Sequence, residues 1–340
     1  MDESRRQFIA TGATLAVGAL LPRAAEAAGP IPNSAAGALR LVTYSPGAAA
    51  PRVGAVNASG RVVDLGAAAK AKGMALTFDA GSMVSLIAAG DFAVAQARQL
   101  MLEGGGDGPL VTEVRLLAPI PAPTRNVYAV GWNYLEHFKE GEAMRLKTAE
   151  LPEHPVFFTK AVGTINGPYD PIPYDAKVST AIDWECELAV IIGKRGKNIA
   201  EEDALAHVFG FCVINDTTAR DLQQKKHGGQ WFKGKSLDGH GPLGPWIIPA
   251  SDIDYRKLHL ITRVNGVVKQ DASTEQMYFK VPRIIAELSD GLTLVPGDII
   301  ATGTPPGVGY ARKPPEVLKP GDVMETEIVE IGLLRNVIGA

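Results

Sequence analysis

Short apolar segments, either alternating with polar residues or continuous, recur along the chain from residue 39. Alternation places every second side chain on one face, which is typical of β-strands. The pattern predicts strands over Leu39–Tyr44, Arg52–Val56, Val62–Leu65, Val127–Gly131, Val156–Thr159, Cys186–Ile192, Val208–Val213, Trp246–Ile248, His259–Val264, Asp298–Thr302 and Val323–Ile328. Turns rich in Gly, Pro and Asp separate these segments.

Helical spacing of apolar residues is rarer in this sequence. It predicts helices over Ser82–Leu102, Glu201–His207, Ala219–Lys225 and Phe279–Ser289. Strands and helices do not alternate in a regular rhythm, which argues against a doubly wound, dinucleotide-binding fold. The predicted fold class is therefore α+β and mainly β.

The first 27 residues have the pattern of an export signal rather than of a folded element. Arg5 and Arg6 precede an apolar run that ends near Leu21, and Ala25-Glu26-Ala27 resembles a cleavage site. The run is too short for a stable membrane anchor. Ser4-Arg-Arg-x-Phe-Ile resembles the twin-arginine signal, so we expect a signal peptide over 1–27 and a periplasmic or otherwise extracytoplasmic protein.

Composition shifts divide the remainder. Residues 28–38 are rich in Ala, Gly, Pro and Ser and predict a flexible leader, 39–118 a small N-terminal α+β domain, and 119–340 the main domain after a proline-rich linker. The chain is 46% hydrophobic and 21% charged with net charge −3, and it holds no Lys/Arg block. These values predict a globular protein that binds neither nucleic acid nor an anionic membrane surface.

Two cysteines, Cys186 and Cys212, exclude a disulfide scaffold and a thiolate zinc cluster. Both fall inside predicted strands, so we expect them to be buried and reduced. The alternative is a disulfide between them, which an oxidising compartment would allow.

Acidic residues lie at the start of a strand that the sequence predicts to be buried. Glu185 and Glu187 are two apart and share a face, while Leu188–Ile192 is continuously apolar. Asp216 follows another apolar strand. Like charges at such a place require a cation, and oxygen ligands favour Mg²⁺ or Mn²⁺ over zinc, with Ca²⁺ as a third option. The alternative is an ordinary solvated strand face.

Several longer motifs resemble the fumarylacetoacetate hydrolase family. They are Asp183–Gly193, Asn215–Gln223, Gly234–Ser236, Gly241–Trp246, Val264–Gly266 and Pro296–Pro305. The resemblance covers about 120–338 and, more loosely, 39–118. It implies a rolled mixed β-sandwich, a homodimer, and a Mg²⁺ site built from Glu185, Glu187 and Asp216. Larger members use a fourth aspartate, which has no match near 126–133, so the chain resembles the acylpyruvate-hydrolase-like branch.

The same resemblance gives roles to polar residues around the metal site. His137 and Glu140 are neighbours on a helix, where the carboxylate would orient a general base, and the family places this pair on a lid. Lys235 would hold a substrate carboxylate or enolate oxygen. The predicted substrate contacts are Arg220, Gln223, Thr304 and, as a weaker candidate, Lys160. For each, the alternative is an ordinary polar or solvated residue.

Three functions follow from these residues. The first is a Mg²⁺-dependent hydrolase that cleaves a C–C bond in a small 2-oxo or 2,4-dioxo carboxylic acid, through a water activated by His137 and Glu140 and a pyruvate enolate. The second keeps the metal but decarboxylates, dehydrates or isomerises a related acid. The third is a non-catalytic extracytoplasmic binding protein for 2-oxo acids, which would have no need for a base.

Overall fold

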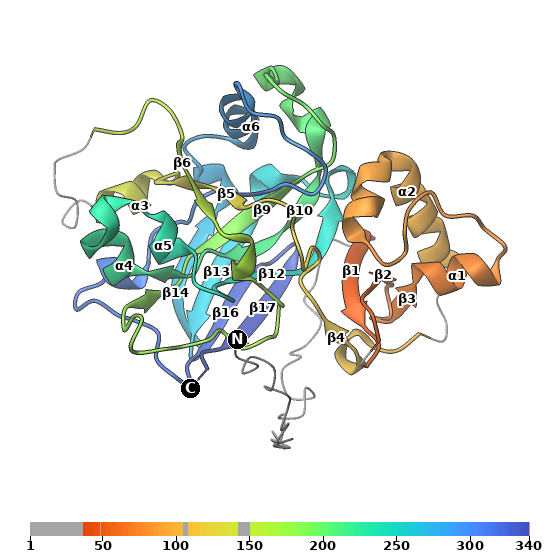
Figure 1. The fold of residues 1–340 in the computed structure, drawn as a ribbon, viewed down its shortest axis with the longest axis horizontal. Coiled ribbons are helices and arrows are strands. Elements are labelled where there is room, and N and C mark those ends of the chain that lie inside the picture. Colours follow the sequence, from red (N-terminus) through yellow and green to blue (C-terminus); the bar gives the residue numbers. More distant parts are fainter. Residues whose placement is uncertain (1–36, 48, 105–107, 142–149, 340) are drawn as a thin grey trace, which may run out of the picture.

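The computed structural model describes residues 37–47, 49–104, 108–141 and 150–339. The predicted signal peptide over 1–27, and all but the end of the predicted leader over 28–38, lie outside the described residues. The described part is built on two large β-sheets and one two-stranded pair, with helices around them, as Figure 1 shows. The expected α+β, mainly β class is confirmed.

The larger sheet is mixed and follows the order β3-β2-β1-β12-β10-β9-β15-β5-β6, with β4 beside β1 and β7 beside β12. Its strands are β1 (Arg40–Ser45), β2 (Arg52–Val56), β3 (Val62–Asp64), β4 (Arg115–Leu116), β5 (Val127–Gly131), β6 (Val156–Lys160), β7 (Ile165–Asn166), β9 (Cys186–Ile192), β10 (Val208–Asn215), β12 (Gly241–Pro249) and β15 (Ile299–Ala301). Strand β15 runs parallel to β5, whereas β9 and β10 are antiparallel.

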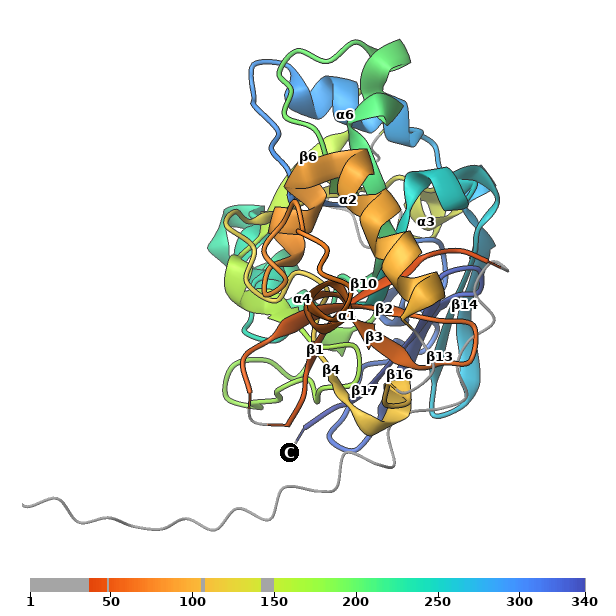
Figure 2. The ribbon, with the colours of Figure 1, turned by 90° about the vertical axis from the view of Figure 1, so that its right-hand side faces the viewer.

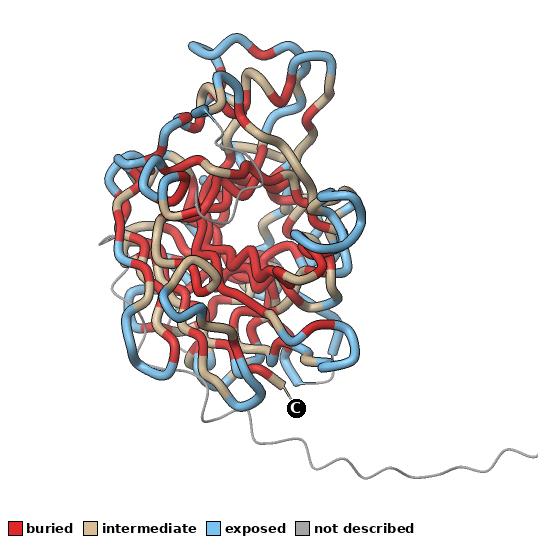
Figure 3. Tube along the Cα trace, turned by 90° about the vertical axis from the view of Figure 1, so that its left-hand side faces the viewer, coloured by how far each residue is buried: buried red, intermediate tan, exposed pale blue. Residues whose placement is uncertain are grey.

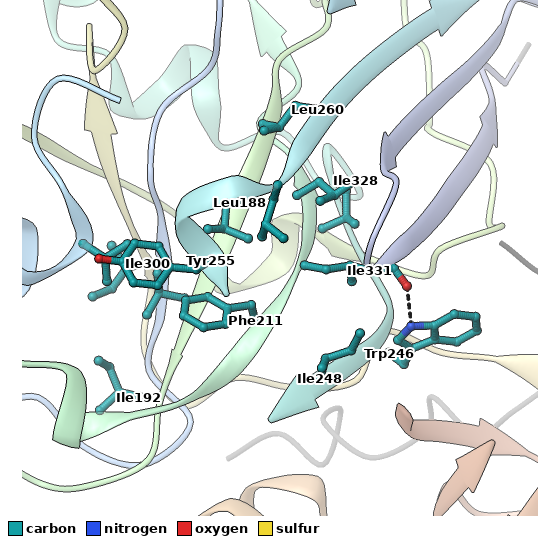
Figure 4. Close-up of a cluster of buried hydrophobic side chains, with 14 of the residues drawn as sticks. Leu188, Ile192, Phe211, Trp246, Ile248, Tyr255, Leu260, Ile300, Ile328 and Ile331 are labelled. Carbon is teal, nitrogen blue, oxygen red and sulfur yellow. Dashed lines mark hydrogen bonds between the residues drawn. The ribbon is translucent and has the colours of Figure 1, made fainter. Parts of the chain in front are cut away.

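The second sheet is antiparallel and contains β13 (His259–Val264), β14 (Val267–Ser273), β16 (Val323–Ile328) and β17 (Gly332–Val337). A separate pair is formed by β8 (Ile182–Asp183) and β11 (Thr218–Ala219). Side chains of both sheets share one hydrophobic core, as Figure 4 shows for Leu188, Phe211 and Ile328. The indole of Trp246 on β12 donates a hydrogen bond to the carbonyl of Ile331 at 2.6 Å, which joins the two sheets.

The helices lie at the ends of this sandwich. They are α1 (Leu65–Ala71), α2 (Met83–Glu103), α3 (Leu135–Glu140), α4 (Arg220–Lys225), α5 (Phe232–Lys235) and α6 (Val281–Ser289). In Figure 1, α3, α4 and α5 gather on one side of the sheets and α1 and α2 on the opposite side. Among the described residues, no helix combines the length and the apolar character that a membrane crossing needs.

The segment from residue 39 is continuous with the large sheet. Strand β1 pairs with β12, with Leu41 opposite Ile247, and its apolar residues share a core with β9 and β15. Figure 2 shows α1 and α2 covering this end of the sheet. The division into an N-terminal domain and a main domain stays a prediction, because residues on both sides of 118 build one core.

Some elements differ from the sequence prediction. Strand β12 begins at Gly241, before the expected Trp246, because a run of Gly and Pro hides the strand pattern. Strands β14 and β17 carry polar residues on their half-exposed faces and were not predicted. Residues 201–207 form a 3₁₀ rather than an α-helix. Helix α2 is interrupted at Gly90, which has a φ of 66°.

Burial is greatest along the central strands and lowest in the outer loops, as Figure 3 shows. All seven residues of β9 are buried, which confirms the strand expected to be covered on both faces. Cys186 and Cys212 are buried and unpaired, and burial raises the pKa of both thiols.

Candidate active site

Three carboxylates meet where β9 and β10 lie side by side. Asn215 at the end of β10 pairs with Cys186 at the start of β9, so Asp216 lies next to Glu185, and its amide donates to the Glu185 carbonyl at 2.9 Å. Glu187 lies two residues further along β9. One carboxylate oxygen from each of Glu185, Glu187 and Asp216 lies within 4.8 Å of the others, and all three residues are buried. The strand register therefore brings together the three residues that the sequence singled out.

Positively charged side chains contact two of these carboxylates. The Lys235 ammonium lies 2.5 Å from Glu185 Oε2 and 2.6 Å from Asp216 Oδ2. Lys160 Nζ lies 2.8 Å from Asp216 Oδ1, and Arg220 Nη2 lies 2.6 Å from Glu185 Oε1. Each of these cations is itself buried. Such pairing offsets the cost of removing charges from water.

The electrostatic situation differs between the carboxylates. Burial alone would raise the pKa of Glu185, but the charges of Lys235 and Arg220 outweigh burial and lower it to about 2. Burial and the neighbouring carboxylates Asp216 and Glu185 raise the pKa of Glu187 well above its usual value. The cations therefore leave Glu187 undercompensated, and a divalent cation would supply the missing charge.

The donor set fits a hard divalent ion. All three side chains offer carboxylate oxygens, the ligands preferred by Mg²⁺ and Mn²⁺. The group of possible metal ligands found among the described residues contains no cysteine or histidine. Glu185, Glu187 and Asp216 would hold the ion.

Glu187 is oriented by a tight turn after β15. Its Oε2 accepts a hydrogen bond from the Gly303 amide at 2.7 Å. Gly303 has a φ of 99°, and a Cβ there would lie 2.7 Å from Asn133 Cβ, so no larger residue fits. Asn133 in turn donates to the Thr302 carbonyl at 2.7 Å and accepts from the Phe279 amide at 2.6 Å. The buried amide side chain fixes the turn that positions the carboxylate.

His137 and Glu140 form a pair on α3. His137 Nδ1 lies 2.7 Å from Glu140 Oε1, and Glu140 Oε2 accepts a hydrogen bond from the Gly307 amide at 2.8 Å. If Nδ1 donates to the carboxylate, Nε2 is the basic nitrogen of the neutral ring. His137 is buried and lines the same cavity as Glu185 and Glu187. The pair is therefore placed for proton transfer beside the carboxylates, and its catalytic role stays a prediction.

Arg220 at the start of α4 is held from two sides. Its Nε donates to Asp183 Oδ2 at 2.8 Å, and its guanidinium lies over the Tyr310 ring, 4.2 Å from the centroid. Asp183 also accepts hydrogen bonds from the amides of Gly309 and Tyr310. Gln223 Oε1 accepts from Arg220 Nη1 at 3.1 Å. Arg220 and Gln223 both line the cavity, as the prediction of substrate contacts requires.

Thr304 and Lys160 have other contacts than those expected. The Thr304 hydroxyl donates to the Cys186 carbonyl at 3.0 Å and accepts from Gln270, although Thr304 also lines the cavity. The backbone amide of Gly303, next to Thr304, donates its hydrogen bond to Glu187. Lys160 is fully buried, donates to the carbonyls of Thr217 and Lys235, and is absent from the cavity wall. Their substrate contacts stay predictions.

The cavity has a volume of about 380 Å³, within the range of small-ligand sites. It is lined by Val130, Gly131, Trp132, His137, Gly141, Phe158, Glu185, Glu187, Arg220, Gln223, Gln224, Gly229, Trp231, Lys235, Thr304 and Tyr310. The sequence prediction missed Tyr310, Trp231 and Asp183 as site residues. Only Asp183 carried a signal, because it alternates with Glu185 and Glu187.

Residues 126–339 match the sequence model of the family described as fumarylacetoacetate (FAA) hydrolase C-terminal. The chain belongs to the fumarylacetoacetate hydrolase family. Oxaloacetate tautomerase YisK of Bacillus subtilis is 45% identical over 267 residues, which cover 76% of this chain and 87% of that protein. The human mitochondrial oxaloacetate tautomerase FAHD2A is 45% identical over 226 residues, covering 66% of this chain and 69% of that one.

A solved structure of the family is similar over most of the chain. Maleylpyruvate hydrolase from Sphingobium sp. SYK-6, in complex with manganese(II) and pyruvate, has a TM-score of 0.68 and 29% identity, covering 88% of this chain and 98% of that one. These comparisons confirm the family and the expected fold. This chain is an enzyme of the family, and its acidic triad can bind a divalent metal.

Proposed function

We propose that this protein is a divalent-metal-dependent enzyme that interconverts the keto and enol forms of a small 2-oxo carboxylic acid. The observation that carries the proposal is that His137, paired with Glu140, lines the same cavity as Glu185 and Glu187 of the acidic triad. A base is thereby placed beside the position where a cation would hold a 2-oxo acid. The names of YisK and FAHD2A, both oxaloacetate tautomerases, support the choice of this reaction over the others.

The proposed reaction moves one proton. Bound Mg²⁺ or Mn²⁺ would act as a Lewis acid that makes the C3 proton of a 2-oxo acid more acidic. His137 Nε2 would remove this proton, and the electron pair of the C3–H bond would form the C2–C3 double bond. The C2 oxygen would then take a proton, which His137 returns, so that no atom is lost or gained. Glu140 would stabilise the protonated imidazole.

The cations have a separate role in this proposal. Lys235 and Arg220 line the cavity next to Glu185, where an ammonium or guanidinium can attract a substrate carboxylate. Both are held in place by ion pairs with buried acidic residues. This pre-organisation is what electrostatic stabilisation of a developing enolate oxygen requires.

Hydrolysis of a C–C bond in a 2,4-dioxo acid is the second candidate. It is favoured by the similarity to maleylpyruvate hydrolase, whose structure contains manganese and pyruvate. In that case His137 would remove a proton from water rather than from carbon. The resemblance to the acylpyruvate-hydrolase-like branch belongs to this candidate. For either reaction, we propose Mg²⁺ or Mn²⁺ as the metal and a homodimer as the assembly.

Proton exchange at carbon separates the two reactions. The Mg²⁺-loaded protein is incubated in D₂O with oxaloacetate and, separately, with an acylpyruvate, and C3 deuteration is followed by NMR. The control is the same mixture with metal but no protein, because metal ions enolise 2-oxo acids unaided. Tautomerase activity predicts enzyme-dependent exchange with the acid intact. In a parallel incubation in H₂¹⁸O, formation of pyruvate and a second acid that carries ¹⁸O supports hydrolysis. Release of CO₂ supports decarboxylation. If no acid is turned over, the result supports a binding protein.

A further inference from the structure

We infer that Tyr310 is a specificity-determining residue of this site, whose hydroxyl donates a hydrogen bond to the second carboxylate of a 2-oxo dicarboxylic acid. The inference rests on the proposed function for the 2-oxo acid head, and it adds the residue that recognises the far end of the molecule. It concerns the part of the cavity wall to which Tyr310, Arg220 and Gly141 belong.

The Tyr310 hydroxyl donates to no acceptor among the described residues. Tyr310 lines the cavity and is only partly buried. A Cβ at Gly141 would lie 3.0 Å from the hydroxyl oxygen, so the hydroxyl lies at the C-terminal end of α3, the helix that carries His137. Glu140 on this helix is not free to take the hydroxyl, because its two carboxylate oxygens already face His137 Nδ1 and the Gly307 amide.

The neighbouring Arg220 side chain also has a donor without an acceptor. Its guanidinium lies over the Tyr310 ring, 4.2 Å from the centroid, so the two side chains are in contact. Arg220 Nη2 is buried and makes no hydrogen bond with a described residue, although it lies 2.6 Å from Glu185 Oε1. Buried donors are normally paired, and one left unpaired costs free energy. A carboxylate has two oxygens, so one such group can accept from Arg220 and from the Tyr310 hydroxyl together.

Lys235 and Arg220 both line the cavity, and they contact the acidic triad differently. Lys235 contacts two residues of the triad, at 2.5 Å and 2.6 Å, so it lies where a bound cation would hold the 2-oxo acid head. Arg220 contacts one residue of the triad, Glu185, and also pairs with Asp183. Each of the two cations can pair with one carboxylate. The charges therefore suit an acid with a carboxylate at each end, such as oxaloacetate, with the second one beside Arg220 and Tyr310.

Asp183 holds Tyr310 and Arg220 in place together. Its Oδ2 accepts a hydrogen bond from Arg220 Nε at 2.8 Å and another from the Tyr310 backbone amide at 3.1 Å. One buried carboxylate therefore positions both donors before a substrate enters, which lowers the entropy cost of binding. Burial raises the pKa of the Tyr310 phenol despite the opposing charge of Arg220, so the hydroxyl keeps its proton and can donate it.

Removal of the hydroxyl alone tests the inference. Tyr310→Phe keeps the ring over Arg220, and oxaloacetate and pyruvate are titrated into the full-length Mg²⁺-loaded protein. Binding is followed by the fluorescence of Trp132 and Trp231, which line the cavity, within seconds of mixing and before oxaloacetate decarboxylates. We expect Tyr310→Phe to weaken oxaloacetate binding about tenfold or more, because a hydrogen bond to a charged group is lost, and pyruvate binding less than about twofold. Tyr278→Phe removes the same atom from an exposed tyrosine and is the matched control, which should change neither affinity.

A second measurement uses the unmodified protein and does not depend on the folding of a variant. The 4-methyl ester of oxaloacetate lacks the second negative charge and should bind about tenfold more weakly than the free acid. Equal binding of ester and acid overturns the inference, as does an unchanged oxaloacetate affinity, or an equal loss of both acids, in Tyr310→Phe. A weakened Mg²⁺ affinity of this variant in calorimetry also overturns it, because the hydroxyl would then act on the metal site. Selective loss of oxaloacetate binding in Tyr310→Phe, with no exchange of C3 protons by the unmodified protein, overturns the tautomerase proposal and leaves the inference standing.

Discussion

Glu187 is buried beside two further carboxylates, and this crowding is the residue-scale feature with the most direct chemical consequence. Lys235, Lys160 and Arg220 contact Glu185 and Asp216, while Glu187 receives a backbone amide. A neutral hydrogen-bond donor compensates a buried charge less than an ion does. The proposed metal binding and proton transfer can therefore be tested by replacing individual side chains.

Removing one charge from the triad should weaken metal binding. Glu185→Gln and Glu187→Gln each keep the shape of the side chain but lose a formal charge, and we expect the Mg²⁺ or Mn²⁺ affinity to fall about tenfold or more. Titration calorimetry measures this affinity. Glu153→Gln, an exposed carboxylate, serves as the control. Unchanged affinity in both triad variants would place the metal elsewhere.

Replacing the base should affect turnover and leave metal binding intact. His137→Ala or Glu140→Gln should slow proton exchange at C3 by roughly 10² to 10⁴, the usual contribution of a general base. His137 is outside the acidic triad, so the metal affinity of the His137→Ala variant should match that of the unmodified protein. His154→Ala is the control, because His154 forms a similar pair with Glu287 at the surface. Full activity of His137→Ala contradicts the proposed base.

At the scale of elements, strand β1 extends the central sheet through its pairing with β12. Its residues Leu41 and Val42 are fully buried on opposite faces, each in a different hydrophobic cluster of the described residues. Strand β12 also continues beside β10, which ends just before Asp216. The N-terminal segment therefore supports the sheet from which the acidic triad is built.

A cavity made on β1 should destabilise the whole described sheet. Leu41→Ala should lower the free energy of unfolding by about 2–5 kcal/mol, the cost of removing a buried leucine side chain. Leu102→Ala should change it by less than about 0.5 kcal/mol, because Leu102 is 74% exposed. Urea denaturation measures both values. If Leu41→Ala shifts only one of two separate unfolding transitions, residues 39–118 unfold on their own, and the prediction is wrong.

At the scale of the whole molecule, the acidic triad lies where β9 and β10 pair in the middle of the large sheet, so a bound metal should stabilise the entire fold. A cation present at 100 times its dissociation constant adds about 2.7 kcal/mol to the native state when the unfolded chain does not bind it. Removing metal with a chelator should therefore lower the melting temperature by several degrees. The Glu187→Gln variant should show a much smaller difference between chelated and metal-loaded samples in the same calorimetric scan.

Export would determine where the whole protein is located, and the prediction of export depends on the first 27 residues. Because Arg5 and Arg6 precede an apolar run and a small-residue cleavage site, we expect a processed chain beginning near Ala28 outside the cytoplasm. Cell fractionation with N-terminal sequencing checks this. Replacing both arginines by lysine should retain the full-length chain in the cytoplasm. An intact Met1 in the unmodified cytosolic protein would show that the signal is not used.

The sequence by itself determined the strands with clear hydrophobic patterns and the residues with the strongest chemistry. Strand β9 carries an unbroken apolar run, and Glu185 and Glu187 on it are separated by the two-residue period of a strand. The His137–Glu140 pair was predicted from its three-residue spacing together with the resemblance to the family. Such features depend on neighbours within a few residues, so a local pattern is enough to predict them.

Only the tertiary structure decided what meets across the cavity. Lys160 lies 2.8 Å from Asp216, and Asp183 holds Arg220, through contacts that span many residues of sequence. Phe158 on β6 and Trp231 pack edge to face, although no periodic pattern in the sequence connects the two positions. Strand register and sheet packing bring such residues together, and both depend on the whole fold rather than on the order of neighbouring residues.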